Sequence, residues 1–575
     1  MRHLELDLTA DFDAHTLSGS ATLEIETAPG VTELILDTRD LLVTAVTAID
    51  DTGESPAAFR LGDSDPLLGA PLSIEVSENT LAVRVEYTTS PGAAALQWLS
   101  PEQTASGKPF LLSQSQAILA RTWVPCQDSP GVRMTYSATL RVPTDLMAVM
   151  SAENPTERAA DGVYRFEMPQ PIPSYLLAVA VGDLEFLAID ERAGVYAEPS
   201  VVASAAWEFA DVSEMMIAAE TLYGPYEWGR YDLLVLPPSF PFGGMENPRL
   251  TFATPTIIAG DRSLVALVAH ELAHSWSGNL VTNATWDDFW LNEGTTTYLT
   301  YRIMEELYGA GYARMIETLG RQDLEATLEE LGSGSADSQL KLALAGRDPD
   351  DGMNDIAYEK GSTFFRTLET AVGRERFDSF LREYFRHFSF RSLDTETFES
   401  YLRDNLVDTE LAEAIDLTEW LYGAGMPAGA WAPESSEFDR VEAQIAALQG
   451  GSSPADLDTS DWTTHHWLHF LRTLPDEFSA NELAALDVAF GFKDSGNSEI
   501  QCAWFERSIR AGHDDAYPAL RGFLLEVGRR KFLKPLYTAL AETPEGTAWA
   551  REVYSAARAG YHSVSSNTID EILDW

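Results

Sequence analysis

The segment that decides the fold runs Leu264-Val-Ala-Leu-Val-Ala-His-Glu-Leu-Ala-His-Ser-Trp276. Its apolar residues recur at helical spacing, so we predict a helix here. His270 and His274 are four residues apart, which places both imidazoles on one face about one turn apart. Imidazoles with that spacing suit one zinc ion. Glu271 follows the first histidine and would lie beside the metal, where it can act as a base toward a water molecule.

A third candidate ligand follows at a fixed distance. Eighteen residues separate His274 from Glu293, which lies within Trp290-Leu-Asn-Glu-Gly294 and in a second predicted helix over 287–307. Two histidines and one glutamate leave a zinc position open for water and substrate, which is typical of a catalytic rather than a structural site. The alternatives are a structural pair of histidines and a glutamate simply exposed on its helix. The three residues together favour a zinc hydrolase.

A loop upstream of the histidines predicts how a peptide is held. It reads Phe240-Pro-Phe-Gly-Gly-Met-Glu-Asn-Pro248. Gly243 and Gly244 allow an extended peptide to approach closely and expose backbone groups for strand-like pairing. Glu246 is then a carboxylate near the metal, and its natural partner is a substrate ammonium, which would set the scissile bond one residue from the N-terminus. Without its context, the loop can equally be a plain Gly/Pro turn.

Composition limits the possible functions. A chain of 575 residues predicts three or four domains. Ninety acidic side chains face 39 basic ones, for a formal net charge of −51. So acidic a surface opposes nucleic acids and anionic membranes, because phosphate binding needs clustered cations. Two interpretations of the charge are adaptation to a high-salt cytoplasm and a merely acidic protein from an arginine-preferring genome. We favour the first, halophilic adaptation.

The chain carries no pattern of a secreted or membrane protein. Its first residues alternate apolar and polar, and no stretch approaches the roughly 20 apolar residues of a membrane helix. Cys126 and Cys502 are far apart, which argues against a disulfide framework and excludes a cysteine-based zinc site. We therefore expect a cytoplasmic protein, and a monomer.

Hydrophobic patterning divides the chain into an α+β multidomain protein. Residues 1–188 alternate with period two and predict an N-terminal β saddle or sandwich. Residues 189–425 mix helical segments with strand signals and form the predicted catalytic domain. A linker over 426–437, rich in Pro, Gly and Ala, precedes a helical domain over 438–575.

Together these motifs resemble the gluzincin zinc aminopeptidases, in which a G-x-M-E-N exopeptidase loop precedes HExxH-x18-E. The run from Ser275 to Gly294 is similar in particular to the leukotriene hydrolase/aminopeptidase branch. The likeness covers nearly the whole chain and continues through Gln114-Ser-Gln-Ala-Ile118, Pro125-Cys-Gln-Asp-Ser-Pro130, Tyr358-Glu-Lys-Gly361 and Gly528-Arg-Arg-Lys531. It implies a saddle-like β domain, a thermolysin-like α/β catalytic domain and an all-α superhelical domain.

The resemblance also implies roles for single residues. His270, His274 and Glu293 would hold one Zn²⁺ per chain, so that zinc-bound water attacks the scissile carbonyl. Glu271 would be the general base and later protonate the leaving amine. Tyr358 would donate its hydroxyl to the oxyanion, although on sequence alone it can be a half-buried core tyrosine. Substrate would be bound by Gln116, Ala117, Gly243, Gly244, Met245, Glu246, Arg529 and Lys531.

These residues predict a molecular ruler. Gln116 and Glu246 would bind the α-ammonium of a short peptide, and Arg529 and Lys531 would bind its C-terminal carboxylate at the far end of the channel. Such a ruler favours tripeptides. The alternative for the basic pair is a helix-end cluster that neutralises nearby acids.

Phe242, Asp350 and Met353 are possible pocket residues, and they bear on a second activity, the hydrolysis of lipid epoxides. In the branch that hydrolyses lipid epoxides, a tyrosine five residues before the catalytic one corresponds to Met353 here, and a phenol before the Gly-Gly loop corresponds to Phe242. Asp350 matches an acid of that pocket. We therefore expect epoxide hydrolysis to be weak or absent. Phe242 and Met245 also suggest an apolar lining.

Two other functions compete with an aminopeptidase. A thermolysin-like endopeptidase would share the zinc residues, but the Gly-Gly-Met-Glu-Asn loop argues against it. A catalytically inert helical scaffold is the non-enzyme alternative, and the presence of a residue for every chemical role argues against that.

Overall fold

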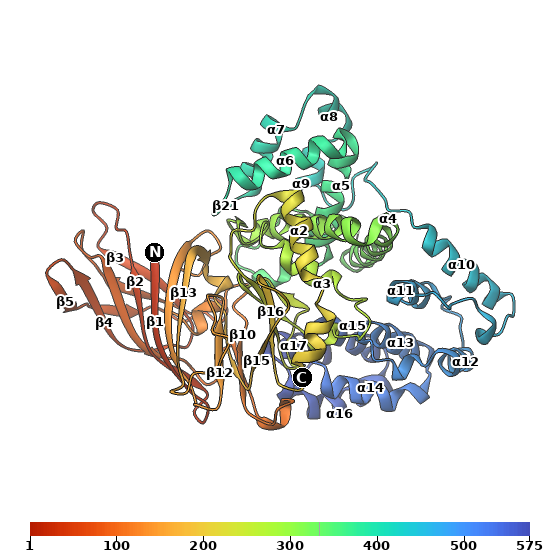
Figure 1. Cartoon of the computed structure of the whole chain (residues 1–575), viewed down its shortest axis with the longest axis horizontal. Coiled ribbons are helices and arrows are strands. Elements are labelled where there is room, and N and C mark those ends of the chain that lie inside the picture. Colours follow the sequence, from red (N-terminus) through yellow and green to blue (C-terminus); the bar gives the residue numbers. More distant parts are fainter. Residues whose placement is uncertain (333) are drawn as a thin grey trace.

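The computed structural model describes residues 1–332 and 334–575, with β-sheets at the N-terminal end and helices over the rest of the chain (Figure 1). The strand β1 shows why the first part folds as sheet. Leu4, Leu6 and Leu8 are buried while their neighbours are exposed, which is the period of a strand with one face on a core. β1 pairs in parallel with β11 and antiparallel with β2. The first sheet has the order β13 (Val163–Pro173), β11 (Arg133–Arg141), β1 (His3–Asp11), β2 (Thr16–Glu24), β8 (Ala82–Thr88), β4 (Leu42–Asp50) and β5 (Gly53–Pro56).

Two smaller sheets complete the N-terminal β domain. One is antiparallel, with the order β12 (Met147–Met150), β14 (Val179–Gly182), β10 (Phe110–Ser113) and β9 (Leu96–Leu99). The other has the order β3 (Glu33–Thr38), β7 (Ala70–Glu75) and β6 (Phe59–Leu61). β10 is buried along its whole length, and the chain leaves it directly toward Gln116, so this strand anchors a predicted site residue.

A mixed sheet begins the catalytic region. Its order is β15 (Glu185–Ala188), β16 (Ala193–Ala197), β17 (Tyr231–Val235), β19 (Leu250–Ala253) and β18 (Gly244–Met245). The domain boundary that we predict at residue 188 falls at the end of β15, so this strand pairs with the sheet of the catalytic region although the prediction assigns it to the N-terminal domain. β18 is an edge strand and runs antiparallel to β19. The Gly-Gly loop therefore lies at an edge of the sheet, where an extended peptide can add a strand.

Helices form the rest of the catalytic region. They are α1 (Val202–Glu208), α2 (Val212–Tyr223), α3 (Ala266–Ala273), α4 (Phe289–Leu331), α5 (Gly361–Val372), α6 (Arg374–His387), α7 (Thr395–Asn405), α8 (Thr409–Ala414) and α9 (Leu417–Tyr422), with the short strands β20 (Val281–Asn283) and β21 (Arg391–Leu393) between them. The first predicted helix corresponds to α3, which packs against α4. The second corresponds to the first half of α4, which breaks at Gly309, where φ is 86°.

The C-terminal helices enclose a core of their own. They are α10 (Ser436–Gln449), α11 (Thr464–Thr473), α12 (Ala480–Phe490), α13 (Ser498–Ala511), α14 (Tyr517–Glu526), α15 (Arg530–Ala541), α16 (Pro544–Ala557) and α17 (Ser563–Leu573). Met315 and Leu319 of α4 join this core and so tie it to the catalytic region. The starts of two of these helices reach the other domains: Ser563 Oγ of α17 donates to the main-chain oxygen of Ala94 at 3.0 Å, and the amide of Arg530 in α15 donates to that of Pro241 at 2.8 Å. Over the described residues, no helix is long and apolar enough to cross a membrane.

Candidate active site

The three side chains predicted to bind zinc converge. His270 lies in α3, His274 ends that helix, and Glu293 lies near the start of α4. The two histidine Nε2 atoms are 3.2 Å apart. Glu293 Oε2 lies 3.2 Å from His270 Nε2 and 3.4 Å from His274 Nε2. A tetrahedral ion with bonds of about 2.0–2.1 Å holds neighbouring ligand atoms about 3.3 Å apart, so this donor set fits one zinc ion.

The other ring nitrogens of the histidines face acceptors. His274 Nδ1 lies 3.0 Å from the main-chain oxygen of Ser277 and 3.1 Å from Thr296 Oγ1. His270 Nδ1 lies 3.4 Å from Thr300 Oγ1. Each threonine donates its own proton to a main-chain carbonyl, Thr296 to Ser277 and Thr300 to Thr296, so its oxygen is free to accept. Both Nδ1 atoms therefore carry the proton, and both Nε2 lone pairs are left for the metal.

Glu271 is buried beside these ligands, in contact with the Gly-Gly loop. A Cβ at position 244 would lie 2.3 Å from Glu271 Oε1, so only glycine at that position leaves the carboxylate its place. Burial, with the nearby carboxylates of Glu246 and Glu293, raises the pKa of Glu271 well above its ordinary value. A buried carboxylate with a raised pKa is suited to accept a proton near neutral pH.

The carboxylate of Glu246 adjoins the same centre. Ligand atoms of Glu246, Glu271 and His274 lie within 4.8 Å of one another. Asn292 Nδ2 donates to Glu246 Oε1 at 3.3 Å, and Asn279 Nδ2 donates to the main-chain oxygen of Glu246 at 2.7 Å. These two amides hold Glu246 in place and leave part of its carboxylate free to accept a further donor.

Gln116 and Ala117 enter the same cavity from the β domain, after β10. The peptide bond between them is cis. Gln116 is 6% exposed, and its Nε2 has no hydrogen-bond partner among the described residues. A buried polar side chain without a partner is costly, which is consistent with a site that a ligand completes.

Met245 differs from its neighbours in the loop. Its side chain is 2% exposed and belongs to the core, where Gln114 Nε2 lies 3.2 Å from its sulfur. Gly244 and Glu246 line the cavity, whereas the side chain of Met245 does not. Side chains of a strand alternate between its two faces, so the residue between two cavity-lining positions must point away. The apolar lining expected from Met245 is therefore not found, and only its main chain lies at the edge of the sheet.

Tyr358 approaches the metal site from a single π-helical turn, η8 (Ile356–Lys360). Its ring stacks on His270, with centroids 6.1 Å apart. Gly294 permits this approach: a Cβ there would lie 2.6 Å from the main-chain oxygen of Ala357 and 2.7 Å from Cα of Gly361. Burial raises the pKa of Tyr358 well above its ordinary value, so the phenol stays protonated and can donate a hydrogen bond.

The two basic residues predicted to bind the substrate carboxylate, which also line the cavity, share one partner that sequence reasoning missed. Glu499 of α13 lies 3.3 Å from Arg529 Nη1 and 2.9 Å from Lys531 Nζ. Arg529 Nη1 also donates to Thr256 Oγ1 at 3.2 Å. Glu499 is separated from Arg529 by thirty positions, and nothing in its sequence context marks it among ninety acidic residues.

The main chain joins this basic segment to the Gly-Gly loop. The amide of Gly528 donates to the oxygen of Pro238, and the amide of Arg530 donates to the oxygen of Pro241, both at 2.8 Å. A Cβ at Gly243 would lie 2.7 Å from Arg529 Nη2. The segment that carries Arg529 therefore packs directly against the loop that carries Glu246.

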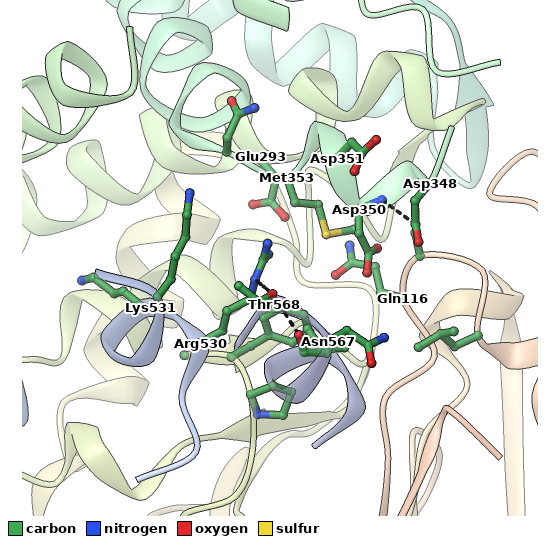
Figure 2. Close-up of a pocket in the computed structure, with 18 of the residues that line it drawn as sticks. Gln116, Glu293, Asp348, Asp350, Asp351, Met353, Arg530, Lys531, Asn567 and Thr568 are labelled. Carbon is green, nitrogen blue, oxygen red and sulfur yellow. Dashed lines mark hydrogen bonds between the residues drawn. The ribbon is translucent and has the colours of Figure 1, made fainter. Parts of the chain in front are cut away.

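One cavity of about 1070 Å³ is lined by the three zinc-binding side chains and by Gln116, Glu246, Glu271, Tyr358, Arg529 and Lys531. Phe242, Asp350 and Met353 also line it, as predicted pocket residues. Figure 2 shows Gln116, Asp350 and Met353 near one another, with Arg530 and Lys531 rising from α15. Burial raises the pKa of Asp350 to about 7.

The catalytic region has a zinc site of two histidines and one glutamate, and the cavity around it is lined by carboxylates and by cations. These features define a zinc-dependent metallopeptidase that acts on peptide ends. Comparisons with known proteins give the family. The Peptidase M1 N-terminal domain matches residues 1–176, the Peptidase family M1 domain matches 207–420, and the Leukotriene A4 hydrolase C-terminal domain matches 462–573. The chain belongs to the peptidase M1 family, with the C-terminal domain of leukotriene A4 hydrolase, and is a zinc aminopeptidase.

Individual relatives cover the whole chain. The leukotriene A-4 hydrolase of Xenopus laevis is 36% identical over 601 residues, 100% of this chain and 97% of that protein. Leucine aminopeptidase 2 of Yarrowia lipolytica is 37% identical over 599 residues, 98% of this chain and 90% of that protein. The structure of yeast leukotriene A4 hydrolase in complex with bestatin superposes with a TM-score of 0.92 at 34% identity, over 100% of this chain and 95% of that one. The resemblance, the multidomain fold and the zinc cofactor inferred from sequence are confirmed.

Proposed function

We propose that this enzyme removes single residues from the free N-termini of short peptides and prefers tripeptides. The observation that carries the proposal is the placement of opposite charges along one cavity. The carboxylate of Glu246 adjoins the three zinc-binding side chains, and the guanidinium of Arg529 lines the same cavity beside Gly243. A peptide with both ends free has an ammonium for the first and a carboxylate for the second.

The N-terminal residue would be held by Gln116 and Glu246. The ammonium would donate to the free oxygen of Glu246 and to the amide oxygen of Gln116, and the unpartnered Nε2 of Gln116 would donate to a carbonyl oxygen of the substrate. The peptide backbone would pair along the edge at Gly243 and Gly244. Held in this way, the first peptide bond lies at the metal site, and bonds further along the chain do not.

The chemical roles follow from the side chains around that bond. Zinc, held by His270, His274 and Glu293, supplies a Lewis acid that polarises the scissile carbonyl and lowers the pKa of water. Glu271 would accept a proton from the attacking water on its carboxylate and then deliver it to the leaving amine. Tyr358 would donate its hydroxyl proton to the oxyanion, a contribution of about 3 kcal/mol for one good donor.

The preference for tripeptides depends on Arg529. This side chain is 5% exposed, and its buried Nε has no hydrogen-bond partner among the described residues. Nε and Nη2 together can bind one carboxylate in bidentate fashion. Replacing Arg529 with Ala should raise KM for a tripeptide far more than for an aminoacyl anilide, which has no carboxylate. Equal effects on both substrates would contradict the preference.

The experiment that tests the proposal compares a free tripeptide with its N-acetylated twin, in high salt, with and without a zinc chelator. We expect chelator-sensitive release of the first residue from the free peptide alone. Cleavage of both peptides would identify the endopeptidase alternative, and no cleavage by zinc-loaded protein would identify the inert scaffold. Incubation with a lipid epoxide is a second assay, in which we expect weak or no product because Met353 and Phe242 lack the phenol oxygens.

We also propose that the enzyme acts in the cytoplasm as a monomer, on peptides rather than on nucleic acids or membranes. The net charge of −51 supports the choice of peptides over nucleic acids and membranes, because such a surface repels phosphate-rich partners. Sedimentation and cell fractionation test the assembly state and the location.

A further inference from the structure

Arg530 lies between the two cations proposed to bind a substrate carboxylate, but it does not share their partner. Arg529 and Lys531 both contact Glu499. Arg530 instead donates from Nε to Thr568 Oγ1 at 2.8 Å, which ties it to α17. Consecutive residues at the start of a helix point in different directions, so Arg530 faces a different part of the cavity from its neighbours.

The guanidinium of Arg530 is not neutralised by the protein. Within the described residues, no carboxylate oxygen of Asp or Glu lies within 4.0 Å of its nitrogens. The chain carries 90 acidic and 39 basic residues, so carboxylates are available for almost every cation. Both terminal nitrogens of Arg530 therefore keep donors for a ligand.

Arg530 is placed where it can contact a bound substrate. It lines the same cavity as the zinc-binding residues. In Figure 2 the side chain rises from α15 toward Met353, and Asp350 lies beyond on the opposite segment, η7 (Pro349–Gly352). Burial raises the pKa of the Asp350 carboxyl group, and the positive charge of Arg530 lowers it and so offsets part of that rise. The two groups thus face each other across the cavity without forming an ion pair.

We propose that Arg530 determines specificity by binding a carboxylate of the substrate. Thr568 fixes Nε, so the two terminal nitrogens lie in a set plane and can bind a carboxylate in bidentate fashion. The carboxylate is either the C-terminus of the peptide or an Asp or Glu side chain. This inference rests on the proposed function, since it names a chemical class of substrate for the same cavity.

Kinetics with matched tripeptides separate the two sources. All peptides in the set have the same first residue. One has uncharged side chains and a free C-terminal carboxylate, and a second is its C-terminal amide. Two further C-terminal amides carry either Glu or Gln at the second or third position. For Arg530→Met we expect KM to rise about tenfold or more for the peptides that carry the recognised carboxylate. KM for the neutral amide should stay within about twofold. Loss of the acid-over-amide difference identifies the C-terminus, and loss of the Glu-over-Gln difference identifies a side chain.

Three further variants test the geometry at constant ionic strength. Arg530→Lys should restore only part of the effect, because an ammonium is a point charge without a planar fork. Thr568→Val should give a smaller rise in KM on the same peptides only, since Thr568 positions Arg530 through the bond to Nε and carries no charge of its own. Arg521→Ala is the matched control: Arg521 is exposed on α14 and does not line the cavity. Circular dichroism and Tm check that each variant folds.

Direct binding keeps this inference distinct from the proposed function. The same peptides are titrated by calorimetry into zinc-loaded Glu271→Gln protein, with and without Arg530→Met. If the holoenzyme hydrolyses none of them but Arg530→Met still weakens carboxylate binding about tenfold, the proposed function fails and the subsite stands. If the neutral amide is hydrolysed and Arg530→Met removes neither the acid-over-amide difference nor the Glu-over-Gln difference, the subsite is overturned and the function stands.

Discussion

Gly244 and Glu271 are in such close contact that a Cβ on the glycine would lie 2.3 Å from Glu271 Oε1. The contact joins the proposed substrate-binding edge to the proposed general base. The atom that would have to move is the end of a flexible side chain, so displacing it costs little stability. The same displacement moves the carboxylate away from the water that it must deprotonate, so a small structural change acts on catalysis.

Gly244→Ala should therefore lower kcat/KM by about 100-fold, because a shift of an ångström in a catalytic group has an effect of that order. The Tm should change little. Gly522→Ala is the control, since a Cβ there meets nothing within 4 Å, and it should leave activity unchanged. A Gly244→Ala variant with full activity would contradict the expected displacement of the Glu271 carboxylate.

The two threonines of α4 should affect zinc affinity unequally. Thr300 is the acceptor that the structure gives His270 Nδ1, whereas His274 Nδ1 has both Thr296 and the oxygen of Ser277. Thr300→Val should weaken zinc binding about 10- to 100-fold, and Thr296→Val should weaken it less. Competition with a chelator measures the zinc Kd. Thr318→Val, which removes a hydroxyl further along α4, is the control and should change nothing. Equal zinc affinities for all three variants would contradict the assignment.

Removing the phenol oxygen of Tyr358 should affect the transition state alone. Tyr358→Phe keeps the ring that stacks on His270. We expect kcat to fall about 100-fold or more, with KM and Tm nearly unchanged, because the lost hydrogen bond forms only to the oxyanion. Steady-state kinetics on a tripeptide measure it. A change confined to KM would instead indicate a role in ground-state binding.

Glu499 should make stability depend on pH in acid. Burial would raise its pKa, but Lys531 and Arg529 outweigh that and hold the pKa at about 2, below the ordinary 4.5. A carboxylate with a lowered folded-state pKa stabilises the fold above its unfolded pKa, and this contribution is lost as pH falls toward 2. The contribution is about 3 kcal/mol in full.

The free energy of unfolding of Glu499→Gln should therefore lie below that of the wild type at pH 6, and the gap should narrow between pH 4.5 and 2. Denaturant titrations at several pH values measure it. Glu506→Gln on the same helix, which breaks a more exposed pair with Arg510, should cost less than about 1 kcal/mol. A gap that stays constant with pH would contradict the proposed ion pair.

The acidic surface predicts a requirement for salt. At low ionic strength the repulsion among carboxylates acts over about 10 Å or more, whereas molar salt screens it within about 3 Å. Dialysis into dilute buffer should therefore lower Tm and activity, and added salt should restore both. Full activity in dilute buffer would favour the alternative of a merely acidic protein.

The parts of the site that depend on local spacing could be predicted from sequence. His270 and His274 share a face of α3 because four residues make about one helical turn, whatever surrounds the helix. The alternation in β1 and the helical period of the C-terminal segments are local in the same way. The Gly-Gly pair predicts the close approach of an extended peptide, but not the contacts that positions 243 and 244 make with Arg529 and Glu271.

Only the tertiary structure decided which distant residues meet. Glu499, Thr300 and Thr568 act on groups thirty or more positions away, and each looks like an ordinary polar residue of its helix in the sequence. Met245 was expected in the pocket, but the register of β18 turns its side chain into the core. The physical reason is that helical and strand periods fix directions within one element, whereas contacts between elements depend on how whole elements pack.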